Sequence, residues 1–335
     1  MNRSRLCLAF STLALCCTAL AILVYGVMSW DLVWNGAALR LTGGDSSWNP
    51  LLDERLPRLL VLGLSGASLA VAGSVMQSLF QNPLASPSVL GVSGGGSFCM
   101  LLVLVGGVHF EHPMLLPLAA LGGSLCSLFL VYLLAYRQGR LYPSSLILTG
   151  IAISSLLMAL HSLILYFYRE EWQLIQTISE WEAGSTLDRG WRHVHMQAPL
   201  AIIGLWMCLH YRREIQILVL GEEEAKMLGV EVERVRWHLF LAVALLVGGT
   251  LAAIGPLAFF GLLVPHLVRL LLRGNEQQLV VISALSGAAA LSLLDLFLRV
   301  TGLFMLSLGN LSAILGGLLF LFLLLRSQKQ EAQWF

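Results

Sequence analysis

The chain has 335 residues, of which 57% are hydrophobic and only 12% are charged. Its mean hydropathy of +0.80 excludes an ordinary soluble domain, in which about a quarter of the residues are charged. The net charge of +1 provides no basic footprint for nucleic acid, so we expect membrane lipid and no nucleic acid among its partners.

The N-terminus has two interpretations. Met1-Asn2-Arg3-Ser4-Arg5 is followed by apolar residues, and Ala19-Leu20-Ala21 resembles the cleavage site of a secretory signal. The apolar run continues to about Val27, which is long enough to span a bilayer, and further spans follow. We therefore expect a retained first helix.

Roughly ten apolar segments have spanning or near-spanning length. They lie near residues 6–29, 57–80, 90–108, 114–136, 144–167, 195–210, 237–256, 258–272, 277–298 and 308–326. Segment 258–272 is short and could be partly re-entrant, whereas the polar, Trp-rich segment 170–192 suits an interfacial helix. The pattern predicts an all-α polytopic membrane protein with a single transmembrane domain over residues 1–335.

Basic residues predict the orientation of these spans. With ten spans, six clusters fall on one side, which is then the cytoplasm: Arg3 and Arg5, Arg137 and Arg140, Arg212 and Arg213, Arg234 and Arg236, Arg269 and Arg273, and Arg326 with Lys329. Both termini are therefore expected in the cytoplasm.

Three arginines fall on the outer side instead. Arg55 and Arg58 open the second span, and Arg299 closes the ninth. They could snorkel toward lipid phosphates. Alternatively, their guanidinium groups could recognise carboxylates of an extracytoplasmic partner.

Polar residues within the spans are few. Two prolines in Asn82-Pro83-Leu84-Ala85-Ser86-Pro87 forbid a continuous helix after Gln77. Asp295 lies one turn before Arg299, where an ion pair would lower the cost of both charges. The spans carry no chain of ionisable residues, which argues against an ion-coupled secondary transporter. Small residues such as Gly66, Gly91 and Gly287 predict close helix packing.

A polar island at residues 211–236 separates two apolar segments. Gly221 and Gly229 punctuate it, and Glu222, Glu223 and Glu224 follow the first glycine, where a helical turn favours negative charge. One interpretation is one or two short helices presented to a soluble partner. The other is an ordinary solvated loop.

The sequence offers little chemistry of other kinds. It contains no Gly-x-x-x-x-Gly-Lys-Ser/Thr loop, so any ATP hydrolysis belongs to a separate polypeptide. The six cysteines lie in apolar runs without metal or redox spacing. His109, Glu111 and His112 in one outer loop, with His193 and His195 near another, could form a metal site, but nothing fixes their geometry. We expect no metal and no cofactor, and neither a nucleophile and base nor a metal cluster that would indicate a membrane-embedded enzyme.

Several motifs together resemble the FecCD-type permeases, which are the membrane subunits of type II ABC importers for iron–siderophores, haem and cobalamin. The resemblance covers nearly the whole chain, and the cobalamin importer's permease is similar in length and span count. It is carried, in order, by Arg55-Leu56-Pro57-Arg58, Gly66 to Gly73, Gln77, Asn82 to Gly91, Trp181-Glu182-Ala183-Gly184-Ser185, Leu220 to Val230, Gly255 to Arg269 with Pro265-His266, and Asp295 to Arg299.

The resemblance implies a role for each candidate site. Arg55, Arg58 and Arg299 match the arginines that meet acidic residues of a binding protein. The island, at about 213–234, matches the coupling helices that dock on the ATPase, through Leu220, Gly221, Glu222, Glu223, Glu224, Ala225, Lys226, Leu228 and Gly229. The cytoplasmic gate and pathway match Tyr142, Pro143, Ser144, Ser145, Ser154, Ser155 and Met158.

The expected function is that of a permease subunit, not an enzyme, in an ATP-driven importer of an iron chelate or cobalamin-like cargo. The resemblance implies two copies of a cytoplasmic ABC ATPase, a periplasmic or lipid-anchored substrate-binding protein and a second permease subunit, identical or not, in the bacterial inner membrane. An ion-coupled secondary transporter of the same cargo class is the alternative. One departure is that Met305-Leu306-Ser307-Leu308-Gly309 replaces the family's usual Glu-Leu-Pro-x-Gly.

Overall fold

The computed structural model describes residues 3–25, 30–43, 48–107, 114–137, 140–141, 143–187, 189–272, 278–303 and 306–331. Ten helices in this part of the chain coincide with the ten predicted spans. They are α1 (Arg3–Val24), α3 (Leu56–Leu79), α4 (Val92–Val105), α5 (Leu115–Ala135), α6 (Pro143–Phe167), α8 (Trp191–His210), α11 (Val232–Ile254), α12 (Phe260–Leu272), α13 (Leu279–Thr301) and α14 (Leu308–Glu331).

The other elements are short. They are α2 (Trp30–Leu41), the π-helical turn η1 (Pro50–Arg55), the 3-10 turn η2 (Pro87–Leu90), the antiparallel strands β1 (Tyr136–Arg137) and β2 (Arg140–Leu141), α7 (Trp172–Glu182), α9 (Arg212–Leu218) and α10 (Glu222–Met227). The sequence predicted α7, α9 and α10, but it provided no prediction of α2 or of the β1–β2 hairpin.

The all-α prediction is confirmed. Among the described residues, six spans are long and apolar enough to cross a membrane, and three apolar helical stretches are shorter. The tenth, α8, carries polar residues in its first turns. The predicted break after the second span is also present, because α3 ends at Leu79 and the chain turns through η2 before α4 begins.

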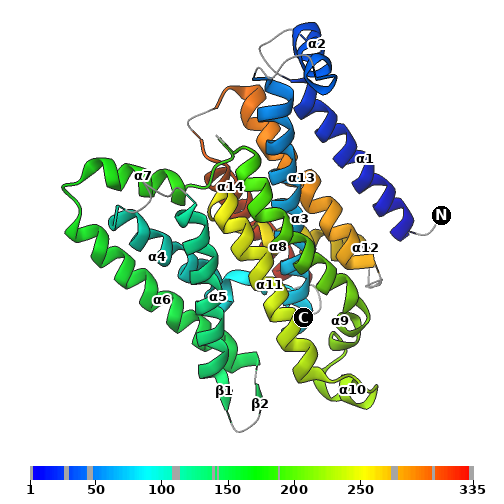
Figure 1. Ribbon diagram of the computed structural model, residues 1–335. Helices are drawn as coiled ribbons and strands as arrows, with labels where there is room; N and C mark the ends of the chain where they lie inside the picture. The colour runs from blue at the N-terminus through cyan, green and yellow to red at the C-terminus, as the bar shows by residue number, and fades with distance from the viewer. Residues whose placement is uncertain are drawn as a thin grey trace.

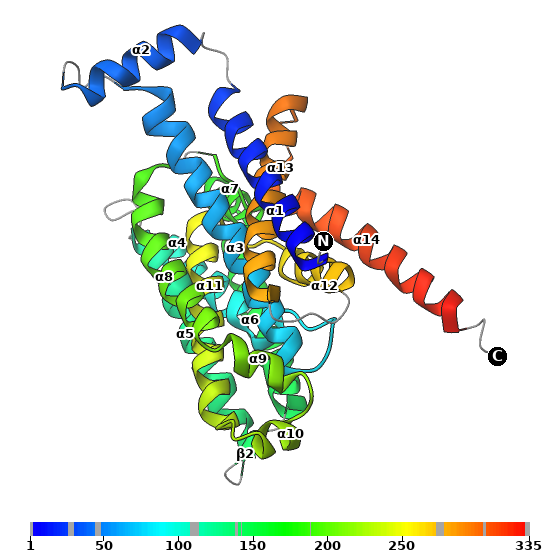
Figure 2. The same cartoon turned by 90° about the vertical axis from the view of Figure 1, so that its right-hand side faces the viewer.

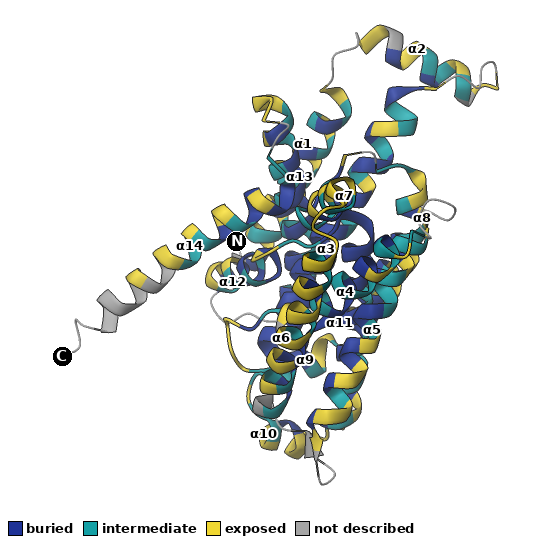
Figure 3. Cartoon of the chain, turned by 90° about the vertical axis from the view of Figure 1, so that its left-hand side faces the viewer, coloured by how far each residue is buried: buried dark blue, intermediate teal, exposed yellow. Residues whose placement is uncertain are grey.

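Helices α3 and α11 form the centre of the bundle, where they are buried along most of their lengths (Figure 3). Glycine allows the closest crossing. A Cβ on Gly66 of α3 would overlap the carbonyl of Gly287 in α13, and a Cβ on Gly287 would overlap the carbonyl of Gly66. Because neither residue has a side chain, the two backbones meet directly, as the small-residue pattern predicted.

The Pro265-His266 motif contributes to a second close crossing. Pro265 has no N–H, so the carbonyl of Gly261 one turn earlier loses its usual helical donor. A Cβ on Gly73 of α3 would overlap that carbonyl and touch the proline ring. The Gln77 side chain donates to the neighbouring Leu262 carbonyl (3.0 Å). This motif therefore fits α12 against α3.

The two ends of the bundle carry different short elements (Figure 1). Helices α9 and α10 lie at the same end as the β1–β2 hairpin, whereas α2 lies at the opposite end (Figure 1). Helix α14 leaves the bundle obliquely (Figure 2). With the basic residues on the α9–α10 side, that end corresponds to the predicted cytoplasmic face and the α2 end to the outer face.

Candidate functional site

The predicted coupling element consists of α9 and α10, joined by a turn at Gly221. Gly221 has a φ of +135°, and a Cβ at this position would collide with the carboxylate of Glu224. Glycine is the residue that adopts this backbone conformation without strain. The chain can therefore reverse direction between two helices of 7 and 6 residues.

The end of α10 is fixed by a second glycine. The N–H of Val230 donates to the carbonyl of Ala225 (3.0 Å) and that of Gly229 to Lys226 (3.0 Å), while Gly229 has a φ of +84°. This is the Schellman arrangement, which satisfies the last carbonyls of a helix. Ala225 faces inward and is fully buried. Both glycines that punctuate the sequence therefore define α10.

Three apolar side chains of the coupling element face solvent. Leu220, Met227 and Leu228 are 65%, 85% and 62% exposed. Met227 was not among the predicted site residues, although it is the most exposed of the three.

The three adjacent glutamates have different surroundings. Glu222 forms ion pairs with Lys226 and with the buried Arg236 of α11, both at 2.8 Å. Burial alone would raise the pKa of the Glu222 carboxyl, but the hydrogen bonds and charges of Lys226 and Arg236 hold the pKa below its ordinary value. Glu223 and Glu224 are exposed. The sequence analysis assigned the same role to all three glutamates, whereas the structure shows that Glu222 links α10 to α11 through its ion pair with Arg236.

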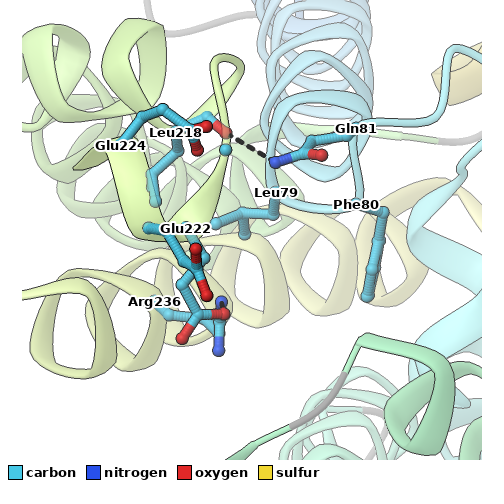
Figure 4. Close-up of a pocket in the computed structure, with 9 residues that line it drawn as sticks. Leu79, Phe80, Gln81, Leu218, Glu222, Glu224 and Arg236 are labelled. Atoms are coloured by element: carbon cyan, nitrogen blue, oxygen red, sulfur yellow. Dashed lines mark hydrogen bonds and ion pairs between the residues drawn. The ribbon is translucent and has the colours of Figure 1, made fainter. Parts of the chain in front are cut away.

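A cavity of about 320 Å³ lies between α10 and the end of α3. Gln81, which has a φ of +48°, donates from its side chain to the Leu218 carbonyl of α9 (3.2 Å), and Glu222 and Arg236 point toward each other (Figure 4). These contacts connect the coupling element to two central helices, α3 and α11.

The predicted gate and pathway residues are spread over both faces of α6. Tyr142 lies outside the described residues, and only the backbones of Pro143 and Ser144 are described. Ser145 donates to the Ala135 carbonyl of α5 (3.3 Å), across the base of the β1–β2 hairpin.

Further along α6, Ser154 packs against Gly91 and Gly94 next to α4. Ser155 and Met158 lie on the open face, where Met158 is 67% exposed. Only the open face is available to a pathway or to another subunit.

The three outer arginines all have partners within this chain. Arg58 donates through Nε and Nη2 to the two carboxylate oxygens of Asp295 (3.1 and 2.6 Å), and both residues are buried. Arg55 donates to the carbonyls of Leu23 and Val24 (2.8 and 3.2 Å), so it caps the C-terminus of α1, where a cation is favoured.

Arg299 is the most accessible of the three. Its Nη2 lies 3.2 Å from the exposed Glu54 of η1, and its Nε lies 3.9 Å from Asp295. The predicted pair with Asp295 is therefore present, but Asp295 bonds Arg58 more closely. Neither sequence interpretation, lipid or partner carboxylate, anticipated the internal acceptors of Arg55 and Arg58 or the pair of Arg299 with Glu54.

Sequence reasoning missed two polar contacts near the outer end. Thr186 donates to Asp295 (2.5 Å). His161 lies within the fifth span, and its Nε2 is 3.2 Å from Oε1 of Glu182, a polar contact without the alignment of a hydrogen bond. A histidine inside an apolar span was a visible signal, whereas nothing in the sequence distinguished Thr186.

The candidate metal residues do not form a site in the described structure. His109, Glu111 and His112 lie outside the described residues. His193 contacts Arg189 and His195 stacks on Trp191. Among the described residues, no group of three or more potential ligands is placed to hold a metal ion.

Comparison with known proteins finds one family along most of the chain. Residues 8–326 match the FecCD transport family. The chain is 37% identical to the Fe(3+) dicitrate transport system permease FecD of Escherichia coli, covering 95% of this chain and 97% of that protein. It is 34% identical to the hemin transport permease HmuU of Yersinia pestis over 98% of both chains.

Two further comparisons agree with these matches. The vitamin B12 import permease BtuC of Vibrio cholerae is 38% identical over 84% of this chain and 86% of its own. A solved ABC transporter of the metal-chelate type, in an inward-facing conformation, superposes with a TM-score of 0.82 at 29% identity, covering 95% of this chain and 98% of that one.

Proposed function

The chain belongs to the FecCD transport family, and from that premise we propose that it is the permease subunit of an ATP-driven importer for an iron chelate or a cobalamin-like cargo. The relatives carry ferric dicitrate, hemin or vitamin B12 by name. These cargoes share a metal held within an organic chelate. The cargo of this chain belongs to that class.

One observation carries the ATP-driven part of the proposal. The α9–α10 element presents exposed Leu220, Met227 and Leu228 beside Glu223 and Glu224, at the predicted cytoplasmic end of the bundle. A short helix of fixed shape with an apolar and acidic surface suits the groove of a soluble subunit. We assign this surface to a cytoplasmic ABC ATPase, present in two copies per complex.

A second permease subunit completes the pathway. The open face of α6 exposes large apolar side chains together with Ser155. Paired with the same face of another subunit, identical or not, it would line a weakly polar route suited to releasing a bulky chelate. The bacterial inner membrane, with both termini in the cytoplasm, is the proposed location.

Docking of a periplasmic or lipid-anchored binding protein is assigned to the outer face around Arg299. The partly buried Arg299 pairs there with the exposed Glu54, and a partner's carboxylate can replace Glu54 at the guanidinium. Arg55 and Arg58 have internal acceptors, so their part in docking is to shape this face and to contribute positive potential.

Reconstitution tests the proposal. The purified chain alone should neither hydrolyse ATP nor accumulate ferric dicitrate, haem or cobalamin in vesicles. Adding its cognate ATPase and binding protein should give ATP hydrolysis stimulated by the loaded binding protein, together with uptake of one of these chelates. Uptake by the chain alone would contradict the proposal.

A further inference from the structure

Residues 182–186, which comprise the last residue of α7 and the four residues after it, contact four other helices, and we call them the junction segment. Its Ser185 N–H donates to the Ile254 carbonyl at the end of α11 (2.9 Å). Its Gly184 carbonyl accepts from the Gly309 N–H at the start of α14 (3.3 Å). Glu182 contacts His161 of α6, and Thr186 donates to Asp295 of α13.

Glycine residues allow the backbones of the junction segment, α11 and α14 to approach one another closely. A Cβ on Gly309 would overlap the carbonyl of Ala183, and one on Gly255 would lie 2.5 Å from the carbonyl of Trp181. Gly184 and Gly255 both have positive φ angles, of +71° and +80°. The ends of α7, α11 and α14 therefore interlock without intervening side chains, so a shift of the junction segment displaces three helix ends together.

Asp295 connects this junction to the outer arginines. It is 1% exposed and accepts hydrogen bonds from Arg58 on one side and from Thr186 on the other, while Arg299 lies 3.9 Å away. Oδ1 accepts from Arg58 and from Thr186 at once. Any change in how the arginines hold Asp295 therefore changes its bond to Thr186.

The cluster is electrically balanced at rest. Arg58 and Arg299 carry two positive charges, and Asp295 and Glu54 carry two negative charges. A partner carboxylate that pairs with Arg299 adds negative charge near Asp295 and competes for the same guanidinium. Within a poorly hydrated site such a change acts strongly on the remaining hydrogen bonds.

We propose that Asp295 and Thr186 are positioning residues for transport, which transmit docking at the outer arginines to the junction segment and through it to α6 and α14. This inference rests on the proposed function, because it requires a docking partner at Arg299. It adds a route by which that partner acts on α6, whose open face we assign to the pathway, and on α14.

The test compares Thr186→Val with Thr186→Ser in the full complex of permease, ATPase and binding protein in lipid nanodiscs. Valine removes the hydroxyl while keeping the shape, and leaves the Arg58–Asp295 pair in place. Thr177→Val is the matched control, because the exposed Thr177 hydroxyl donates, among the described residues, to the Gln173 carbonyl of its own helix, α7. Binding-protein affinity, basal ATP hydrolysis and stimulated ATP hydrolysis are measured for each variant.

We expect Thr186→Val to bind the binding protein with wild-type affinity but to lose about tenfold in the ratio of stimulated to basal hydrolysis, the size of a typical coupling between sites. Thr186→Ser and Thr177→Val should keep the wild-type ratio. Adding Asp295→Asn to Thr186→Val should reduce the ratio no further than Asp295→Asn alone, because both changes break one connection.

Three results would overturn the inference: a wild-type ratio in Thr186→Val, loss of affinity in parallel with stimulation, or failure of serine to restore the ratio. If Asp295→Asn does not fold, the comparison of Thr186→Val with Thr186→Ser decides alone. A wild-type complex whose ATP hydrolysis ignores the binding protein would instead contradict the proposed function.

Discussion

At the scale of single residues, the outer arginines look alike in the sequence, but Arg58 is buried against Asp295 whereas Arg299 lies beside the exposed Glu54. Removing Arg58 would leave the Asp295 carboxylate buried without its partner, a loss of roughly 3–5 kcal/mol. Substitution of Arg58 therefore tests folding more than docking. Arg299, beside the exposed Glu54, can be changed with less damage.

Arg299→Lys and Arg299→Glu test the docking assignment. Lysine keeps the charge but loses the planar fork, so affinity for the binding protein should fall severalfold. Glutamate places like charges in opposition and should weaken binding by several kcal/mol. Affinity is measured on nanodisc complexes at low and high salt, with Arg192→Lys, near the outer end of α8, as the control.

Wild-type affinity in both Arg299 variants would remove Arg299 from the docking surface and favour contact with lipid phosphate. Recovery of the Arg299→Glu variant by a charge-reversed binding protein would identify the opposing acidic residue. Thermal unfolding of each variant distinguishes a docking defect from a folding defect.

At the scale of elements, α10 carries one glutamate that forms ion pairs within the chain, Glu222, and two exposed glutamates, Glu223 and Glu224. Because the pKa of Glu222 is lowered in the fold, its ion pairs stabilise α10 at neutral pH. That contribution is lost only as the pH falls from the ordinary carboxyl pKa through the lowered one. Glu223 and Glu224 have no comparable partner among the described residues, and in our proposal they face the ATPase.

Separate substitutions should therefore have separate effects. Glu223→Ala with Glu224→Ala should weaken the ATPase contact and reduce coupled uptake, while α10 itself stays folded. Glu222→Ala should loosen α10 from α11 by about 1 kcal/mol, since its carboxylate is partly exposed and screened. Gly221→Val should disrupt coupling most, because valine cannot adopt the required φ without strain.

Uptake and binding-protein-stimulated ATP hydrolysis are the measurements, with insertion checked by membrane yield. Glu180→Ala is the control, because Glu180 lies outside the coupling element, and its exposed carboxylate accepts a hydrogen bond from Gln176 of the same helix, α7 (2.8 Å). Normal uptake in Gly221→Val would exclude α10 as the coupling element.

The elements were largely predictable, because their signals are local. Apolar length identified the ten spans, and Gly221 and Gly229 marked the two ends of α10 in the sequence itself. The distant partnerships were not predictable. Arg58 and Asp295 are 237 residues apart, and only the crossing of α3 and α13 shows that they meet. Likewise, the need for glycine at position 309 comes from the carbonyls of Ala183 and Pro256, which lie next to it only in the folded chain.

At the scale of the whole molecule, the placement of charged groups among the spans helps to distinguish ATP from an ion gradient as the energy source for transport. Within the described spans, Arg58 pairs with Asp295, and His161 lies 3.2 Å from Glu182 of α7. These two contacts do not form a continuous relay across the bundle. A proton- or sodium-coupled carrier normally uses such a relay. An importer driven by a separate ATPase does not require one, and in our proposal ATP hydrolysis acts on this chain through α9 and α10.

Uptake by ATP-loaded vesicles containing the whole complex should therefore persist when an uncoupler removes the proton gradient, and should stop when ATP is withheld. The two treatments separate the energy sources because the uncoupler leaves ATP inside the vesicles intact. Vesicles loaded with a non-hydrolysable ATP analogue are the control for binding without turnover. Collapse of uptake with the gradient, at unchanged ATP, would favour the ion-coupled carrier and would assign the buried ion pairs to the path of the driving ion.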